Sequence, residues 1–479
     1  MKLKRLLILL IILLPQYILA QTDIFEALDS TFNARVRAMD NRFRNYTRQM
    51  DEDFATYLAQ SWEKFPMEEI ETGRFSDKAN FVNVTFPASA KYPLYSPVKG
   101  AEYKETKVYF FEKELIMNVD VKTRFSMLSI SEFQVSWAWK KLTATSFSTI
   151  IKEMDKFRTQ LHLNDWGVYL LISQLADQIF VDKQVNEKKV FMAFMLTHAG
   201  YNVKLGRAGK GTGREACLHL LIPFKTKVDE WKTEIEGKTY YTWTGKEDDG
   251  LNMTYAATDD LYSYRKNMKM AKADLDLAIK YVPLMGSKTS QKAVSSKSKY
   301  LQEVKITWTN SLTEFYDTYP CTILPIYANT PLSESTTKSL HQSFQPALDN
   351  MSKTEFVGEL LFWFYHAFQY RLDEVERPFF SEQTVKSLYS DCEDRAVLFA
   401  RILKEIAGLD VVLVVFEGKD EKISHVATGI CFEEKVTGES KIYNEKIYTI
   451  CDPSDKRCAI GRTLDEYRDS KHEIIELIN

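Results

Sequence analysis

Residues 388–415 constrain the fold of this chain most strongly, because they combine a helix start, a buried helix face and a buried strand. Ser390 can cap a helix, and Glu393, three residues later, can reach back to complete a capping box. The apolar residues that follow recur mostly at helical spacing and predict one buried face: Ala396, Phe399, Ala400, Leu403 and Ile406. Gly408 can take the left-handed conformation that ends a helix. The β-branched run at 411–415 then predicts a buried strand.

Cys392 lies in the first turn of this predicted helix. Amide dipoles at a helix N-terminus favour a thiolate, so a cysteine nucleophile would be placed here. The neighbouring Glu393 and Asp394 oppose ionisation, so the helix dipole and an imidazole must outweigh them. Cysteine is also commonly buried as a small apolar side chain, so Cys392 alone does not define a site.

Two further residues complete a candidate constellation. A strand is predicted from Val426 onward, with His425 at its beginning, and a return strand at 446–451 ends at Asp452. A hairpin of this shape can bring His425 near Asp452, at the edge that meets the helix N-terminus. Thiol, imidazole and carboxylate are the three groups that nucleophilic cysteine catalysis requires.

Three motifs resemble those of the transglutaminase-like superfamily, and most closely its bacterial transglutaminase-like cysteine proteinase branch. They are Ser-Asp-Cys-Glu-Asp-Arg-Ala at 390–396, His-Val-Ala-Thr-Gly at 425–429 and Tyr-Thr-Ile-Cys-Asp-Pro-Ser at 448–454. Residues 368–373 and 378–384 also resemble the approach to the family's cysteine, so the resemblance covers about residues 345–467. Ser390 stands where the family commonly has Gly, and Ser454 where it usually has Thr.

The resemblance implies an α+β fold with a papain-like, transglutaminase-like C-terminal domain. It implies Cys392 as nucleophile, His425 as general base and acid, and Asp452 as the carboxylate that orients the imidazole. Gln369 or Tyr370, from the preceding helix, could donate to the developing oxyanion or could simply pack.

An internal comparison suggests a second, degenerate transglutaminase-like unit. Residues 190–205 resemble residues 398–413 at an offset of 208, and the same offset relates 217–224 to 425–432 and 239–244 to 447–452. We interpret this as a duplication; chance similarity between two helix-strand-strand units is the alternative. The upstream unit carries Gln184, Cys217 and Thr244 at the three triad positions, so it cannot perform the same chemistry.

The N-terminus predicts export. A basic start, a short apolar run and Ala20 before Gln21 are typical of a cleaved secretory signal, and the run is too short to span a membrane. The predicted organisation is a signal peptide at 1–20, a long amphipathic helix at 21–68, a β-containing segment at 75–144 with two strands within 108–129, a degenerate repeat at 145–285, a linker with short strands at 286–344 and a catalytic domain at 345–479. Within it, the Lys/Ser-rich tract at 286–299 predicts a mobile surface loop or linker.

Composition excludes several functions. A net charge of −3 argues against a nucleic-acid partner. The chain lacks paired Cys or His at metal-ligand spacing, so neither a metal nor a cofactor is expected. The glycine-rich residues 206–213 lack the full spacing of a phosphate loop and predict a flexible loop. Six cysteines are too few for a disulfide scaffold, and whether Cys451 pairs with Cys458 stays open.

The sequence therefore predicts an exported, soluble cysteine enzyme, periplasmic or extracellular, that performs thiol acyl transfer on peptide or protein amides. Hydrolysis is favoured; a cross-linking transglutaminase and a non-enzymatic peptide-binding scaffold with a vestigial triad are the alternatives. The apolar stripe of the N-terminal helix packs on the body of the protein or on a partner chain.

Overall fold

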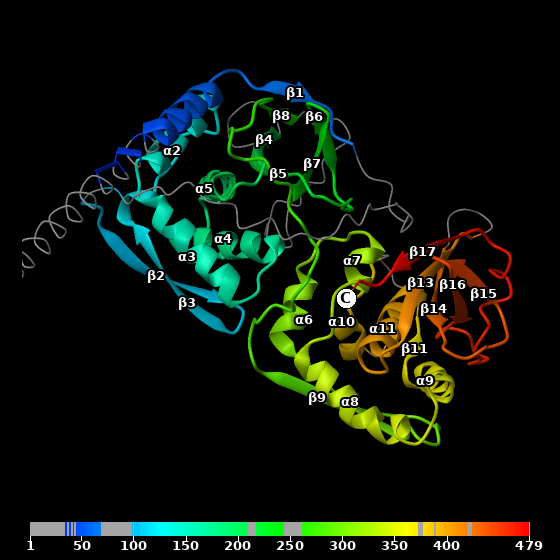
Figure 1. Ribbon diagram of the computed structural model, residues 1–479. Helices are drawn as coiled ribbons and strands as arrows, with labels where there is room; N and C mark the ends of the chain where they lie inside the picture. Colours follow the sequence, from blue (N-terminus) through cyan, green and yellow to red (C-terminus); the bar gives the residue numbers. More distant parts are fainter. Residues whose placement is uncertain are drawn as a thin grey trace, which may run out of the picture.

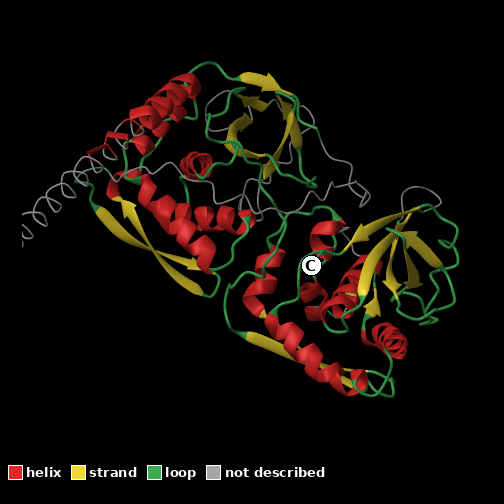
Figure 2. Cartoon of the chain, in the orientation of Figure 1, coloured by secondary structure: helices red, strands yellow, loops and turns green. Residues whose placement is uncertain are grey.

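The computed structural model describes residues 34–35, 38–39, 42, 45–68, 98, 100–208, 217–243, 261–371, 377–387, 389–418 and 424–478. Within these ranges the chain has an α+β fold, built from two units that each pack helices against an antiparallel sheet (Figures 1 and 2). The predicted signal peptide at 1–20 lies outside the described residues. None of the helices in the described ranges combines the length and the apolar character that crossing a bilayer requires.

Among the described residues, the first unit contains the helical residues 45–58, a β-hairpin, the helices α2 to α5 and a six-stranded sheet. Its elements are β1 (Glu63–Phe65), β2 (Tyr103–Phe110), β3 (Lys113–Asp120), η1 (Val121–Thr123), α2 (Glu132–Thr143), α3 (Phe147–Gln160), α4 (Asp165–Ile179), α5 (Val185–His198), β4 (Lys204–Ala208), β5 (Cys217–Ile222), β6 (Lys232–Ile235), β7 (Lys238–Trp243) and β8 (Leu261–Ser263). The two strands predicted within 108–129 form the β2–β3 hairpin, but they begin earlier, and η1 follows them. The hairpin packs against α3 and α4.

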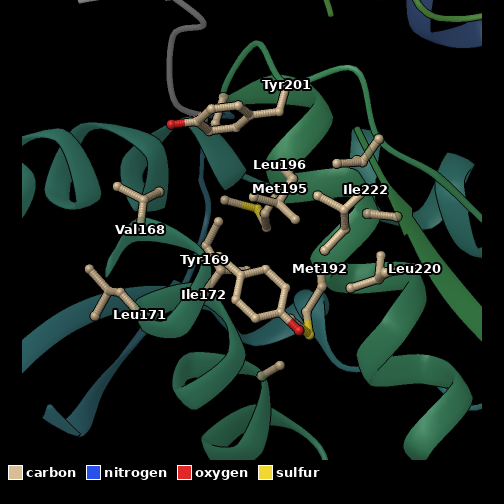
Figure 3. Packing of buried hydrophobic residues seen from close by; sticks show 14 of the residues in the cluster. Val168, Tyr169, Leu171, Ile172, Met192, Met195, Leu196, Tyr201, Leu220 and Ile222 are labelled. Carbon is tan, nitrogen blue, oxygen red and sulfur yellow. The ribbon is translucent and has the colours of Figure 1, made fainter. Parts of the chain in front are cut away.

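The core of this unit forms where α5 packs against the sheet on one side and against α4 on the other. Figure 3 shows their apolar side chains facing those of β5. The labelled residues are Val168, Tyr169, Leu171, Ile172, Met192, Met195, Leu196, Tyr201, Leu220 and Ile222, all buried. Burying an aliphatic side chain of this size contributes about 1.5–3 kcal/mol each, so this layer holds the sheet on its helices.

The predicted helix over 21–68 is wrong at its C-terminal end. Among the described residues, 45–58 are helical and 63–65 form β1. Phe65 leaves the helical pattern because it pairs with Leu261 of β8 and joins a small apolar core there. The buried face also differs from the predicted stripe: Tyr46 is 54% exposed, whereas Asp51 is buried against α5. The helix therefore packs within the chain, partly through a polar contact.

The second unit repeats this plan. Its elements are β9 (Thr289–Ser295), β10 (Glu303–Thr309), α6 (Asn310–Asp317), α7 (Leu324–Ala328), α8 (Glu334–Leu348), α9 (Lys353–Ala367), β11 (Gln369–Tyr370), α10 (Ser381–Lys386), β12 (Tyr389–Ser390), α11 (Cys392–Glu405), β13 (Asp410–Phe416), β14 (His425–Cys431), β15 (Ser440–Tyr443), β16 (Lys446–Cys451) and β17 (His472–Glu476). The prediction of a loop at 286–299 is wrong, because β9 pairs with β10 along its full length and buries Val294.

The two sheets share strand order, and the strands other than β8 and β17 also share register at the 208-residue offset. Strands β8-β4-β5-β7-β6 of the first unit follow the same order as β17-β13-β14-β16-β15 of the second. Lys204 pairs with Leu221, and Val412 with Gly429. Each outer hairpin turns through two residues of positive φ, at 236–237 and at 444–445. A one-residue slip would reverse every side chain, so this match constrains both sheets in the same way.

The units meet through α6 and α7, which belong to the second unit in sequence but join the core of the first. Tyr316 of α6 stacks on Phe380, with ring centroids 4.2 Å apart, and Tyr327 of α7 contacts the same ring. Phe380 directly precedes α10, which packs against α11, the helix that carries Cys392. The inter-unit core therefore lies one helix away from the candidate site.

Candidate active site

Cys392 lies in the first turn of α11, as the sequence predicts, but the helix begins one residue later and its cap differs. Asp391 is the N-cap, with its carboxylate accepting the backbone N–H of Asp394, and Ser390 instead lies on the short strand β12. Asp391 wins because carboxylates are equally good caps and the strand pairing already fixes Ser390. The predicted apolar face is buried, and Gly408 has φ +64° at the helix end.

His425 and Asp452 form a buried hydrogen-bonded pair. Their Nε2 and Oδ2 atoms are 2.7 Å apart, and both side chains are almost completely buried. The pair forms because β14 begins at His425 and β16, which pairs with β14, ends just before Asp452. The predicted hairpin missed the edge strand β15, which lies outside β16 and connects to it through residues 444–445. Because Nε2 is bound to Asp452, Nδ1 is the nitrogen left to take a proton.

Cys392 lies against the same strand. The backbone N–H of Val426, the residue after His425, donates to the sulfur. The thiol itself donates to a carboxylate oxygen of Glu393, with Sγ and Oε2 3.1 Å apart. Burial, together with the negative charges of Glu393 and Asp391, raises the pKa of the Cys392 thiol well above its usual value. In this arrangement the thiol is neutral, so the helix dipole alone does not outweigh the acidic neighbours.

The carboxyl groups of Asp391 and Glu393 are hydrogen-bonded to each other beside Cys392. Burial and the charge of Glu393, to which it is hydrogen-bonded, raise the pKa of Asp391 to about 8. Two carboxylates this close cannot both ionise without a large cost, so one holds a proton at neutral pH. The negative charge facing Cys392 is therefore close to one unit rather than two.

Asp452 is held by more than His425. Burial alone would raise its pKa, but the positive charge and hydrogen bond of His425 lower it below its usual value. Oδ2 also accepts the hydroxyl of Thr463 at 2.9 Å, and Oδ1 accepts the backbone N–H of Ser454 at 2.9 Å. The carboxylate therefore stays ionised and fixed in orientation. The sequence pattern gave no signal for Thr463, because it returns to the site only through the loop after β16.

The path of the loop after β16 depends on a close contact between Gly438 and Gly461. A Cβ on Gly438 would lie 2.4 Å from the Cα of Gly461, and both residues have positive φ. Gly461 donates its backbone N–H to Ile450 of β16 and accepts from Glu439. The contact holds the loop over the sheet and brings Thr463 to Asp452.

Two aromatic rings flank His425. Tyr467 stacks on the imidazole with centroids 4.9 Å apart, and Phe416 of β13 lies 6.4 Å away on a nearly parallel plane. Burial, followed by the charges of Glu466 and Cys392, raises the pKa of Tyr467. Tyr467 was not expected from the sequence, because no spacing rule links it to the motifs.

The two oxyanion candidates have separate outcomes. Gln369 and Tyr370 form β11, where Tyr370 is 51% exposed, rather than a helix. Burial, followed by the charges of Cys392 and its acidic neighbours, raises the pKa of Tyr370, and its ring lies against the guanidinium of Arg395. Gln369 pairs through its backbone with Tyr389 of β12. Tyr370 therefore remains a candidate donor to the oxyanion, whereas no described contact places Gln369 at the thiol.

The matching positions of the first unit hold different contacts. Gln184 donates to the carbonyl of Phe125, and Cys217 lies 2.8 Å from the Nε2 of His219. The amide of Leu218, which corresponds to Val426, donates to Asn186 instead of to a sulfur. Thr244 lies outside the described residues. A Cys392-like nucleophile facing a His425-like base is therefore not assembled among the described residues of this unit.

Within the ranges that the structure describes, no group of three or more His, Cys, Asp or Glu side chains is arranged to hold a metal ion. Cys451 is buried and Cys458 partly buried, and both are thiols rather than a disulfide. Comparison with protein-family models, curated proteins and solved structures gives no match to this chain. The site must therefore be judged on its own geometry.

Proposed function

We propose that this chain is an exported, transglutaminase-like cysteine enzyme that transfers the acyl group of a peptide or protein amide to Cys392 and then to water. One observation carries the proposal: the buried His425–Asp452 pair, at 2.7 Å, lies beside the helix N-terminus that presents Cys392, and the amide next to His425 contacts the sulfur. Thiol, imidazole and carboxylate from three separate elements are the set that this chemistry needs.

The reaction uses His425 twice. Its Nδ1 takes the thiol proton as the sulfur attacks the carbonyl carbon, and the tetrahedral intermediate collapses when the same proton passes to the leaving amine. A water molecule then gives a proton to His425 and attacks the thioester, which releases the acid and restores the thiol. Asp452 stabilises the imidazolium in both steps, because its pKa is lowered and its second oxygen is fixed by the Ser454 amide.

The resting thiol has to leave Glu393 before it can react. Sγ donates to Glu393 in the present arrangement, so the first step transfers its hydrogen bond to His425. The proposed step is a rotation of the Cys392 side chain toward the imidazole, starting from a sulfur that already contacts the amide next to His425. The acidic neighbours therefore set a barrier to ionisation and do not block the geometry.

A burst assay tests the proposal. A panel of peptide p-nitrophenyl esters should release nitrophenolate in a burst equal to the enzyme concentration, with an acyl adduct on Cys392 by mass spectrometry. Cys392→Ser and His425→Ala should abolish the burst, and Cys458→Ser, the matched control, should retain it. Added cadaverine separates the acceptors: amide formation indicates transamidation, and its absence indicates hydrolysis.

The competing proposal is a peptide-binding scaffold with a vestigial triad. The observation in its favour is the neutral, Glu393-bound thiol. It predicts that Cys392→Ala retains the biological role of the protein, and that no acyl adduct forms with any ester in the panel.

A further inference from the structure

Arg395 is a fully buried arginine at the centre of the candidate site. Its residue exposure is 1%, although it lies in the first turn of α11, only three positions after Cys392. Arginine is rarely buried unless its guanidinium is fully bound, so its contacts explain its position. Burial lowers the pKa of Arg395, and Tyr370, Asp452 and Asp391 are among the groups whose interactions oppose this shift.

The guanidinium binds three separate segments. It donates from Nε to the hydroxyl of Ser390 at 3.2 Å, from Nη1 to the carbonyl of Pro453 at 3.4 Å and from Nη2 to the carbonyl of Phe368. Pro453 directly follows Asp452, and Phe368 directly precedes β11. One side chain thus links the nucleophile helix to the carboxylate segment and to the strand that carries Tyr370.

The outer face of the same group is covered by an aromatic ring. The guanidinium carbon lies 5.3 Å from the ring centroid of Tyr370, the remaining oxyanion candidate. A planar guanidinium can stack and donate along several directions at once, which a lysine ammonium cannot do. The equivalent position in the first unit is Glu187, which accepts the backbone N–H of Met127 and serves no such junction.

We propose that Arg395 is a positioning residue: it holds Asp452, Tyr370 and the start of α11 in register, and its positive charge offsets the acidic groups around Cys392. This inference rests on the proposed function, since it concerns the alignment of the same thiol, imidazole and carboxylate. The charge is central to the claim, because the acidic residues Asp391 and Glu393 flank Cys392 and Asp452 interacts with the same guanidinium.

The test is the pH profile of Cys392 alkylation by iodoacetamide, followed residue by residue with mass spectrometry. The proteins are the wild type, Arg395→Lys, Arg395→Met and the matched control Arg401→Lys. Arg401 lies on the same helix, with its side chain 4% exposed and paired with Glu405, but away from the site. Thermal unfolding of each variant measures the loss of stability separately.

Arg395→Lys should lower the alkylation rate of Cys392 at pH 7 by about tenfold, because lysine cannot make the three hydrogen bonds of the guanidinium. The midpoint of the rate–pH profile should stay in place, because the positive charge remains. Arg395→Met should lower the rate and also move the midpoint upward. Arg401→Lys should lower the melting temperature but leave rate and midpoint within about twofold of the wild type.

A merely structural Arg395 would give equal effects for Arg395→Lys and Arg401→Lys on rate and melting temperature, and that result overturns the proposal. If Arg395→Lys does not fold, Ser390→Ala serves instead, because it removes one hydrogen-bond acceptor of Arg395 and leaves the Asp391 cap intact. This variant should lower the alkylation rate of Cys392 about threefold, and an unchanged rate refutes the positioning role of Arg395. A wild-type rate that does not depend on His425 refutes the proposed function itself, whereas a His425-dependent rate that survives Arg395→Lys refutes only the inference.

Discussion

Replacing Glu393 with Gln should make Cys392 more reactive. The carboxylate of Glu393 accepts the thiol hydrogen bond at 3.1 Å and is the larger of the two charges that raise the thiol pKa. Two unit charges about 4 Å apart interact by about 4 kcal/mol at an effective dielectric constant of about 20, which corresponds to about three pKa units. This value is a ceiling for the effect of the substitution.

The expected effect is smaller because Asp391 responds. Its pKa is raised to about 8 by burial and by the charge of Glu393, so it loses its proton near neutral pH once Glu393 is uncharged. A negative charge then returns at Asp391, whose influence on the thiol is weaker. We therefore expect Glu393→Gln to lower the thiol pKa by about one unit, or about tenfold more thiolate at pH 7. Adding Asp391→Asn should bring the effect nearer the ceiling, while keeping a helix cap.

The assay is again the rate–pH profile of alkylation at Cys392. Its midpoint should move down by about one unit in Glu393→Gln and further in the double variant. Glu433→Gln is the control, because Glu433 is 91% exposed and should leave the profile unchanged. A midpoint that stays in place or rises in Glu393→Gln would refute the electrostatic account of the resting thiol.

Three further predictions concern stability. The pKa of Asp391 is about 8 in the folded state and about 3.9 in the unfolded chain, so between these values the folded state holds a proton that the unfolded state lacks. The free energy of unfolding should therefore fall by up to about 1.4 kcal/mol per pH unit as the pH rises through this window. Urea titrations measure this decline, and Asp391→Asn should remove the part of it that Asp391 causes. Asp51→Ala should lower the free energy of unfolding by about 1–3 kcal/mol, since it removes the buried hydrogen bond to His198 Nε2 at 2.9 Å, whereas Arg48→Ala, in an exposed pair, should change it by less than about 0.5 kcal/mol. Gly438→Ala should lower the melting temperature and slow Cys392 alkylation, because the added Cβ meets Gly461 at 2.4 Å; unchanged values in both would contradict the role of the glycine contact in holding Thr463.

Three strands of the second sheet, β13, β14 and β16, were predictable because their patterns are local, whereas β15 and β17 were not predicted. Apolar runs predict β13 and β14, and the apolar spacing that ends at Gly408 predicts α11. The repeat offset was visible in the sequence, and the strand registers follow it, since the side-chain alternation of a paired strand allows no slip.

The errors arose where tertiary contacts outweigh local pattern. Residues 63–65 continue a helical spacing but pair with β8, and the Lys/Ser-rich β9 forms a strand because β10 supplies its partner. The contacts that tune the site were hidden for the same reason. Thr463, Tyr467 and the junction made by Arg395 depend on loops and strands far from the motifs, and no spacing rule connects them.

The most direct test of the account compares alkylation of Cys392 at pH 7 in the wild type, His425→Ala and Asp452→Asn, with site-resolved mass spectrometry. If the three residues act as one unit, both variants should react at least about tenfold more slowly than the wild type. Equal rates in all three proteins, with the fold intact by circular dichroism, would contradict the central claim that His425 and Asp452 activate this thiol.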